Sequence, residues 1–335
     1  MRKIWLFFVL VILSMTLFGA KLADLPDVVR PFQLTVDGDR IYVSASSTVY
    51  MFSMKDFKSL GQFGKQGEGP GEFISRPVLS VYPDSLTIES WGKFMVFSRD
   101  GVYKNETRIP ASTMNVSQLG EFWVARATKP DEKDGIYYNT VNIYDKDFTL
   151  VKNLYKEKSL NVQSGVSDSG KINWPAFTDF MVFKVYNGNT YIGDSSKGFF
   201  IEVFDDKGNK LYEIDRKYEK MKVSDEFKDR HMKMRQSASN WERMKDRVNI
   251  VFPEYLPPFA EFRVQEGKIY VFTHVKKDKN QEMVVLDLKG NELNRVFLPA
   301  NLPDNQTCCI YKDNFYFLSD NEEKEMIELH VVSIK

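Results

Sequence analysis

Apolar and polar residues alternate along most of the chain, in short runs that recur six times. Each run begins at a turn containing Gly, Asp or Asn and continues into a strand centred on an aromatic or β-branched residue. Such alternation predicts a half-buried β-strand. The six runs are Asp37–Val43, Pro83–Ile88, Leu119–Val124, Asn187–Ile192, Glu266–Val271 and Lys312–Phe317.

A second apolar strand follows each run. These second strands are Thr48–Phe52, Lys93–Phe97, Val141–Tyr144, Phe200–Phe204, Met283–Leu286 and Ile327–Val332. Four of them lead into a tight-turn signal and then a third strand, so each unit is an antiparallel meander. Six units of this size predict an all-β fold, a six-bladed β-propeller.

The spacing of the units predicts where the propeller carries insertions. The aligned central residues lie 45, 36, 68, 79 and 46 residues apart, and they are Tyr42, Thr87, Trp123, Tyr191, Tyr270 and Tyr316. A blade needs about 40 to 50 residues. The two long spacings therefore hold insertions, at about 156–171 and about 215–251. The first is polar and rich in Ser and Gly, which predicts a long loop or hairpin.

The second insertion, between blades 4 and 5, predicts an amphipathic helix. Ser224 can cap it, and Asp225 and Glu226 occupy its first turn. One face is expected to carry Phe227, His231, Met234, Ala238, Trp241 and Val248. We expect this face to pack on the propeller itself, and the alternative is a groove for a partner.

The last unit lacks an outer strand, because only three residues follow Val332. Residues 22–29 precede the first unit and belong to no blade of their own. We therefore expect this N-terminal segment to complete the final blade and close the ring. The propeller would then be one domain over residues 21–335.

A glycine-rich segment, Phe63–Phe73, connects the first two units. A phosphate-binding loop is excluded, because no Gly-Lys-Ser/Thr run opens a helix there. Glycine permits positive φ, proline fixes its own φ, and Phe73 can fill the seam between blades. The residues that set the conformation of this connector are Gly64, Gly67, Gly69, Pro70, Gly71 and Phe73.

This connector resembles that of NHL-type six-bladed β-propeller proteins, and the blade pattern from about Phe32 to Lys335 is loosely similar. The resemblance implies the propeller fold and export from a bacterial cell, mostly as a binding module. Some relatives hold a metal through histidines in the central channel. Here His231, His274 and His330 share no recurring blade position, so we expect no metal and no cofactor.

The N-terminus reads as an export signal. Arg2 and Lys3 precede a mainly apolar run from Ile4 to Phe18, which is short for a membrane span. Cleavage after Ala20 gives a signal peptide of residues 1–20 and a periplasmic or extracellular protein without a membrane span. An uncleaved N-terminal anchor is the alternative, because Phe18 stands where a small residue is preferred.

The charge balance of the chain gives no reason to expect a nucleic-acid ligand. The chain has 46 basic and 46 acidic residues, so its global charge does not attract nucleic acid.

The two cysteines, Cys308 and Cys309, are adjacent in the sequence, so they cannot link distant segments of the chain. They are either two packed thiols or a strained disulfide. Asp205–Asn209 is a hairpin turn or, alternatively, a calcium loop.

Motifs of common hydrolases, zinc proteases and redox proteins are absent from the sequence. We therefore expect a non-enzymatic, monomeric binding or scaffolding module of the cell envelope, with a protein, peptide or glycan ligand. A propeller lyase or hydrolase acting at the channel mouth is the alternative. The candidate ligand-binding residues are aromatic residues in or beside connectors, namely Trp91, Tyr137, Tyr138, Trp174 and Tyr255.

Overall fold

A computed structural model describes residues 19–110, 112–131, 133, 136–159, 170–176, 181–238, 240–278, 280–299 and 307–335. Residues 1–18 of the expected signal peptide (1–20) lie outside these residues, as does most of the first insertion. Among the described residues, no helix is long and apolar enough to span a membrane.

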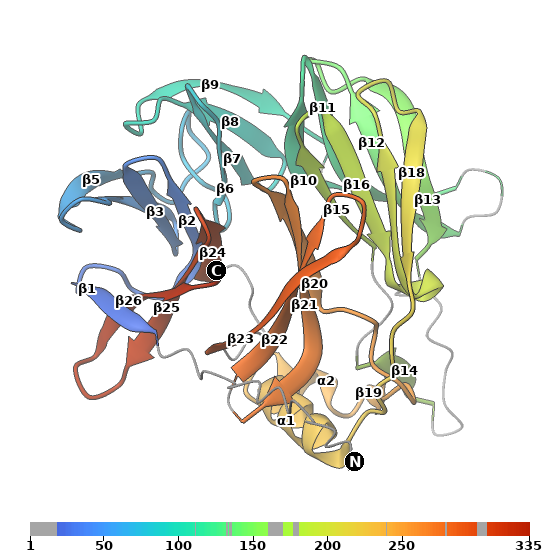
Figure 1. Cartoon of the computed structure of the whole chain (residues 1–335). Coiled ribbons are helices and arrows are strands. Elements are labelled where there is room, and N and C mark those ends of the chain that lie inside the picture. Colours follow the sequence, from blue (N-terminus) through green and yellow to red (C-terminus); the bar gives the residue numbers. More distant parts are fainter. Residues whose placement is uncertain are drawn as a thin grey trace, which may run out of the picture.

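The described strands form six four-stranded antiparallel sheets arranged around a central axis (Figure 1), which confirms the six-bladed propeller. The first blade contains β2 (Pro31–Asp37), β3 (Arg40–Ala45), β4 (Thr48–Ser53) and β5 (Ser59–Phe63). The second contains β6 (Val78–Val81), β7 (Leu86–Ser90), β8 (Lys93–Phe97) and β9 (Tyr103–Arg108). The third contains β10 (Thr113–Leu119), β11 (Phe122–Pro130), β12 (Tyr137–Tyr144) and β13 (Leu150–Lys158).

The second half of the chain supplies the remaining blades. The fourth contains β15 (Met181–Tyr186), β16 (Asn189–Asp194), β17 (Phe199–Phe204) and β18 (Lys210–Arg216), with a short 3₁₀ turn at Ser195–Lys197. The fifth contains β20 (Glu261–Gln265), β21 (Lys268–Lys277), β22 (Asn280–Asp287) and β23 (Glu292–Pro299). The sixth contains β24 (Cys308–Tyr311), β25 (Asn314–Asn321), β26 (Met326–Ser333) and β1 (Ala20–Leu25).

The N-terminal strand closes the ring, as the sequence predicts. β1 pairs antiparallel with β26 and is the outermost strand of the last blade, where the blue and red ends of the chain meet in Figure 1. Leu25 and Val28 are buried between the sixth and first blades. The strand covers Ala20–Leu25 rather than the whole segment 22–29, so Val29 lies beyond it and is 62% exposed.

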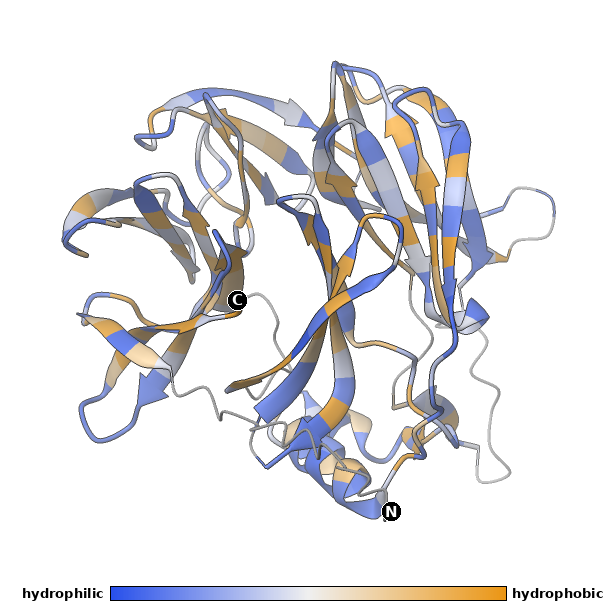
Figure 2. Cartoon of the chain, viewed as in Figure 1, coloured by the Kyte–Doolittle hydropathy of each residue, from blue (hydrophilic) through white to orange (hydrophobic). Residues whose placement is uncertain are grey.

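The core consists of separate apolar clusters between neighbouring blades. Six clusters of buried residues occupy the six seams of the ring, and one of them joins the last blade to the first. Along the strands, apolar and polar residues alternate in colour in Figure 2. Middle strands such as β3 bury both of their faces between neighbouring blades, whereas innermost strands such as β20 alternate between buried apolar and partly exposed polar residues.

Aspartates build the turns between the third and fourth strands of three blades. In each turn Oδ1 of Asp145, Asp205 or Asp287 accepts hydrogen bonds from the backbone N–H groups two and four residues later. These bonds help to lower the pKa of Asp205 and Asp287. The Asp205 segment is thus a hairpin turn, as the first of the two interpretations proposed.

The insertion between the fourth and fifth blades contains α1 (Asp225–Gln236) and α2 (Trp241–Met244). The Ser224 hydroxyl caps α1 by accepting from Phe227 N at 3.1 Å. The predicted continuous helix is wrong beyond Gln236, because the chain turns before α2, and Val248 belongs to strand β19 (Val248–Val251). Met234 is 51% exposed, whereas the guanidinium of the next residue, Arg235, lies 5.1 Å from the centre of the Trp174 ring.

The second insertion also pairs with the segment that follows the first one. Strand β14 (Ile172–Pro175) pairs parallel with β19, although 76 residues separate the partners. This small sheet, α1 and α2 lie together in Figure 1.

Candidate functional site

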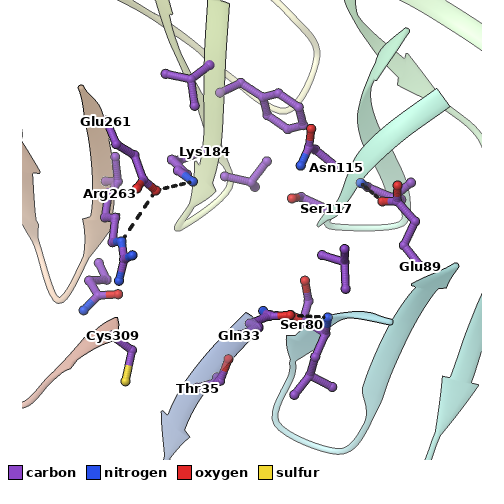
Figure 3. A pocket seen from close by; sticks show the side chains of 18 of the residues that line it. Gln33, Thr35, Ser80, Glu89, Asn115, Ser117, Lys184, Glu261, Arg263 and Cys309 are labelled. Carbon is purple, nitrogen blue, oxygen red and sulfur yellow. Dashed lines mark hydrogen bonds and ion pairs between the residues drawn. The ribbon is translucent and has the colours of Figure 1, made fainter. Parts of the chain in front are cut away.

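The innermost strands of the six blades surround a central channel. Its cavity has a volume of about 430 Å³ and is lined by residues of β2, β6, β10, β15, β20 and β24. Figure 3 looks into this cavity, where polar side chains from several blades point inward. The channel is therefore the place where residues far apart in sequence converge, as in ligand sites of other folds.

The ring has two ends that differ in what surrounds the channel mouth. Because every blade is a four-stranded meander, its turns between second and third strands lie at the same end as the connectors between blades. We call this end the connector face, and among the described residues it includes 46–47, 64–77, 91–92, 195–198, 217–238, 240–260 and 322–325. The insertion therefore lies on the connector face.

One wall of the channel carries a half-buried ionic network. The Glu261 carboxylate lies 3.4 Å from Lys184 Nζ and 3.6 Å from Arg263 Nε, so one anion serves two cations from adjacent blades. Burial lowers the pKa of Lys184. Arg263 also donates to the Cys308 carbonyl oxygen at 2.7 Å, which ties the fifth blade to the sixth.

The opposite wall carries Glu89 without an ion pair among the described residues. Its Oε2 accepts from Val116 N at 2.9 Å, and Asn115 N donates to the same carboxylate. Asn115 has a φ of 58° at a bulge in β10, which turns these two N–H groups toward Glu89. Burial outweighs these bonds and raises the pKa of Glu89. The protein therefore keeps an acidic proton donor or acceptor in the channel wall.

Arg126 adds a third cation to the same cavity. Its Nε atom is buried and has no hydrogen-bond partner among the described residues. Burial lowers the pKa of its guanidinium, and Glu157 partly offsets that effect. A buried donor without an acceptor costs stability, so an anionic or hydroxyl group of a ligand would be favoured beside it.

Two glutamines fix the spacing of the inner strands. Gln33 donates to the Leu79 carbonyl oxygen at 2.6 Å and accepts from Leu79 N at 2.7 Å, so its amide imitates a strand partner across the seam. Gln265 donates to the Ile310 carbonyl oxygen at 2.6 Å across another seam. The Gln33 contact joins the first and second blades at the channel, and the Gln265 contact joins the fifth and sixth blades.

The five aromatic candidates do not meet in the channel. All five lie toward the connector face. Trp91 is in the β7–β8 turn, Tyr137 and Tyr138 begin β12, and Trp174 and Tyr255 lie in the connections from β13 to β15 and from β18 to β20. Trp91 is 70% exposed, and the Tyr138 ring lies 4.0 Å from Lys156 Nζ. They form separate patches around the ring, and none of them lines the central cavity.

The glycine-rich connector is a closed loop packed on the first seam. Phe73 is fully buried there, and Phe73 N donates to the Lys65 carbonyl oxygen at 2.8 Å. Positive φ angles occur at Gly64, Gly67 and Gly71, whereas Gly69 and Pro70 have none. Buried Lys93, which begins β8, donates to the carbonyl oxygens of Glu68 and Gly69, so the second blade holds the connector in place.

The cysteines and histidines give no shared centre. Cys308 and Cys309 are free, buried thiols in different seams, which fits the interpretation as two packed thiols. Burial raises the pKa of Cys309 to about 12. His231, His274 and His330 lie in α1, β21 and β26. Within the described residues, no group of three or more His, Cys, Asp or Glu is arranged to hold a metal ion.

The charged residues of the channel were not recognised as candidates in the sequence. Glu261, Arg263 and Gln265 alternate with Phe262 and Val264 in β20, and Lys184 interrupts the apolar run of β15. Charged residues between the buried apolar positions of an innermost strand are therefore a usable signal for channel-facing residues. Glu89 and Arg126 lie in second strands, β7 and β11, where no comparable pattern marks them.

Comparison with known proteins supports the fold. No curated protein matches the chain in sequence. A member of the DUF4221 family from Bacteroides vulgatus is 11% identical, with a TM-score of 0.52 over 96% of each chain. BamB from Moraxella catarrhalis is 10% identical, with a TM-score of 0.34 over 89% of this chain and 71% of BamB. Kluyveromyces lactis Hsv2 is 10% identical, with a TM-score of 0.40 over 90% of this chain and 97% of Hsv2.

A family model described as 6-bladed beta-propeller, DUF5128, matches residues 27–254. This match covers the first four blades and the helical insertion, and the structure adds the last two blades. The resemblance to NHL-type proteins is not confirmed beyond the shared six-bladed fold. The chain belongs to the DUF5128 family of six-bladed β-propellers.

Proposed function

We propose that the protein is an exported, non-enzymatic binding module of the cell envelope. It holds a protein, peptide or glycan on the connector face, with one polar group of the ligand inserted into the central channel. The N-terminal sequence pattern supports export, and the family fold supports a rigid scaffold. The aromatic residues around the connector face would contact the rest of the ligand.

The observation that carries this proposal is the unequal pairing of charges in the channel. Glu261 is shared by Lys184 and Arg263, whereas Glu89 and Arg126 form no ion pair among the described residues. These last two groups offer a carboxyl and a guanidinium to an incoming ligand. A ligand with both a hydrogen-bond donor and an anionic or hydroxyl acceptor would satisfy them together.

Chain direction favours the connector face as the ligand side. Ala20 pairs with Val331 and Leu25 with Ile327, so β1 starts at the end of the ring opposite the connector face. The described part of the chain therefore begins at that opposite end. If the sequence before it is retained as an anchor, we expect the connector face to point away from the membrane and to stay accessible.

The test uses the chain that starts at Lys21, immobilised and offered a cell-envelope extract and a glycan array. Glu89→Gln and Arg126→Gln each remove one charge from the channel. Matched controls are Glu121→Gln and Arg108→Gln, which change the same residue types at exposed positions outside the cavity. We expect a ligand retained by the parent and both controls, and at least tenfold weaker binding by both channel variants. Equal binding by all five proteins, or no ligand at all, would contradict the proposal.

One observation favours the enzymatic alternative, a lyase or hydrolase. Burial raises the pKa of Glu89, which is a property of general acids. Incubating the recovered ligand with the parent and with Glu89→Gln separates the two functions. Turnover by the parent that Glu89→Gln abolishes would replace the binding proposal with the enzyme, whereas an unchanged ligand supports binding.

A further inference from the structure

A second cavity of about 320 Å³ lies between the fourth and fifth blades, apart from the central channel. It is lined by residues from β17, β18, β21, β22 and β23 and by both ends of the helical insertion. This volume is at the lower end of small-molecule sites in proteins. No residue lines both cavities, so the second one is an independent site.

The strand ladder is interrupted where it meets this cavity. Phe272 pairs with Met283 and Lys276 with Gln281, so three residues of β21 stand opposite the single Glu282 of β22. The displaced residues 273–275 all line the cavity. Bulges often redirect side chains beside functional sites. Here the bulge brings His274 to the cavity wall.

His274 presents an unused acceptor. The imidazole donates to the Phe259 carbonyl oxygen, while Nε2 is buried and has no hydrogen-bond partner among the described residues. Since Nε2 is the unbonded nitrogen, Nδ1 carries the proton in the neutral ring. Burial lowers the pKa of His274 to about 4, so the ring is neutral at physiological pH. Its bare Nε2 then accepts a hydrogen bond from a hydroxyl or N–H group.

Three charged side chains of the cavity wall, Arg216, Glu282 and Arg295, are paired, and the other two, Lys217 and Glu219, carry opposite charges. Arg295 Nη1 lies 2.7 Å from Glu282, and Arg216 Nη2 lies 2.9 Å from Glu292. Glu282 also accepts from the Thr273 hydroxyl at 2.7 Å. A strongly charged ligand would have to break these pairs, so the site favours a neutral one.

The remaining wall is apolar and partly aromatic. Phe199, Tyr218, Met221, Pro257 and Pro258 line the cavity beside the polar groups. Flat rings and proline faces suit the C–H face of a sugar, whose hydroxyls then reach the polar groups.

We propose that this cavity binds a neutral sugar unit, whose hydroxyl donates to His274 Nε2 while its C–H face lies against the aromatic and proline wall. The sugar is either a free monosaccharide or the terminal unit of a longer glycan. This site goes beyond the proposed channel function and does not depend on it.

To test this, the chain that starts at Lys21 is titrated with neutral methyl glycosides of glucose, galactose, mannose and N-acetylglucosamine. Binding is measured by calorimetry and NMR. His274→Phe keeps an aromatic ring but removes the acceptor, and His330→Phe is the matched control in β26. Tyr218→Ser removes part of the apolar wall at a half-buried position, so it provides a variant that disturbs the core less. Loss of a neutral hydrogen bond corresponds to about tenfold in affinity.

We expect at least one glycoside to bind the parent, His330→Phe and Glu89→Gln equally, and to bind His274→Phe and Tyr218→Ser about tenfold or more weakly. The Nε2 resonance of His274 should shift on binding. Tighter binding of an oligosaccharide than of its terminal methyl glycoside identifies a glycan end as the natural form, and equal binding identifies a free sugar. Absence of binding to every glycoside, or binding that His274→Phe and Tyr218→Ser leave unchanged, would overturn the proposal. Failure of the channel proposal alone would affect only the Glu89 and Arg126 variants.

Discussion

Leu25 and Ile327 face each other across the outermost strand pair of the last blade, although 302 residues separate them in the chain. Through this pairing the first described strand completes the sheet formed by the last three. The whole ring therefore depends on a contact between the two ends of the chain.

Deleting residues 22–29 should destabilise the entire propeller. Leu25 and Val28 are buried in the closing seam, and full burial of two aliphatic side chains contributes about 3 to 6 kcal/mol. A typical domain has a net stability of only about 5 to 15 kcal/mol. Thermal denaturation and size-exclusion chromatography should show a much lower melting temperature or aggregation. A chain starting at Arg30 that stays monomeric with an unchanged melting temperature would refute ring closure by β1.

Gly64→Ala should be more destabilising than Gly120→Ala. Both glycines have positive φ, at 84° and 61°, where a Cβ costs about 1 to 2 kcal/mol. A Cβ at Gly64 would also lie 2.1 Å from Cε2 of buried Phe73, whereas nothing lies within 4 Å of one at Gly120. We expect an additional cost of about 1 to 3 kcal/mol at Gly64 in urea denaturation. Equal costs at the two positions would show that Phe73 does not fix the connector.

His274 should make stability depend on pH. Its pKa is about 4 in the folded protein and about 6.5 unfolded, so the unfolded chain binds the proton first as the pH falls. Stability is therefore complete above about pH 6.5 and decreases toward pH 4, by roughly 3 kcal/mol for this group. Melting temperatures between pH 7 and pH 4 should fall less steeply for His274→Phe than for the parent or for His330→Phe. Parallel curves for all three proteins would contradict the buried neutral imidazole.

Export should leave a mature protein that begins at Lys21. Ala20 is a suitable last residue of a signal, and cleavage there removes only the first residue of β1. Lys21 Nζ stays 2.8 Å from Glu328 and 2.6 Å from Asp24, so the new terminus remains attached to the sheet. Mass spectrometry of the protein from the periplasmic and extracellular fractions measures this. An intact Met1 in the membrane fraction would instead support the anchor.

The repeat predicts the number and order of the blades because alternation and turn residues are local signals. Register is harder to predict in blade 3, where Trp123 was aligned with Tyr42 and Tyr191. Trp123 packs in the seam with blade 2, whereas Val124 faces the seam with blade 4 as Tyr191 faces the next seam. Three consecutive apolar residues, Phe122–Val124, hide which of them points to which side, and a shift of one residue exchanges the faces.

The candidate sites were harder to predict than the fold, since they depend on contacts between distant segments. The aromatic residues in connectors were identified, because exposed rings in loops stand out locally. Glu89 and Arg126 reach the channel from second strands, and His274 reaches its cavity only through a bulge in β21. No local pattern marks a bulge, and none indicates which charges have partners across a seam.

The most direct test of the central claim is photo-crosslinking from the two ends of one blade. p-Benzoylphenylalanine is placed at Trp91, which is 70% exposed in the β7–β8 turn on the connector face, or at Val102, which is 63% exposed between β8 and β9 at the opposite end. Both proteins are expressed with their N-terminal sequence and irradiated in cells. We predict a crosslinked ligand from position 91 and none from position 102. A crosslink from position 102 alone would contradict the proposal, because the ligand would then bind the face at which β1 begins.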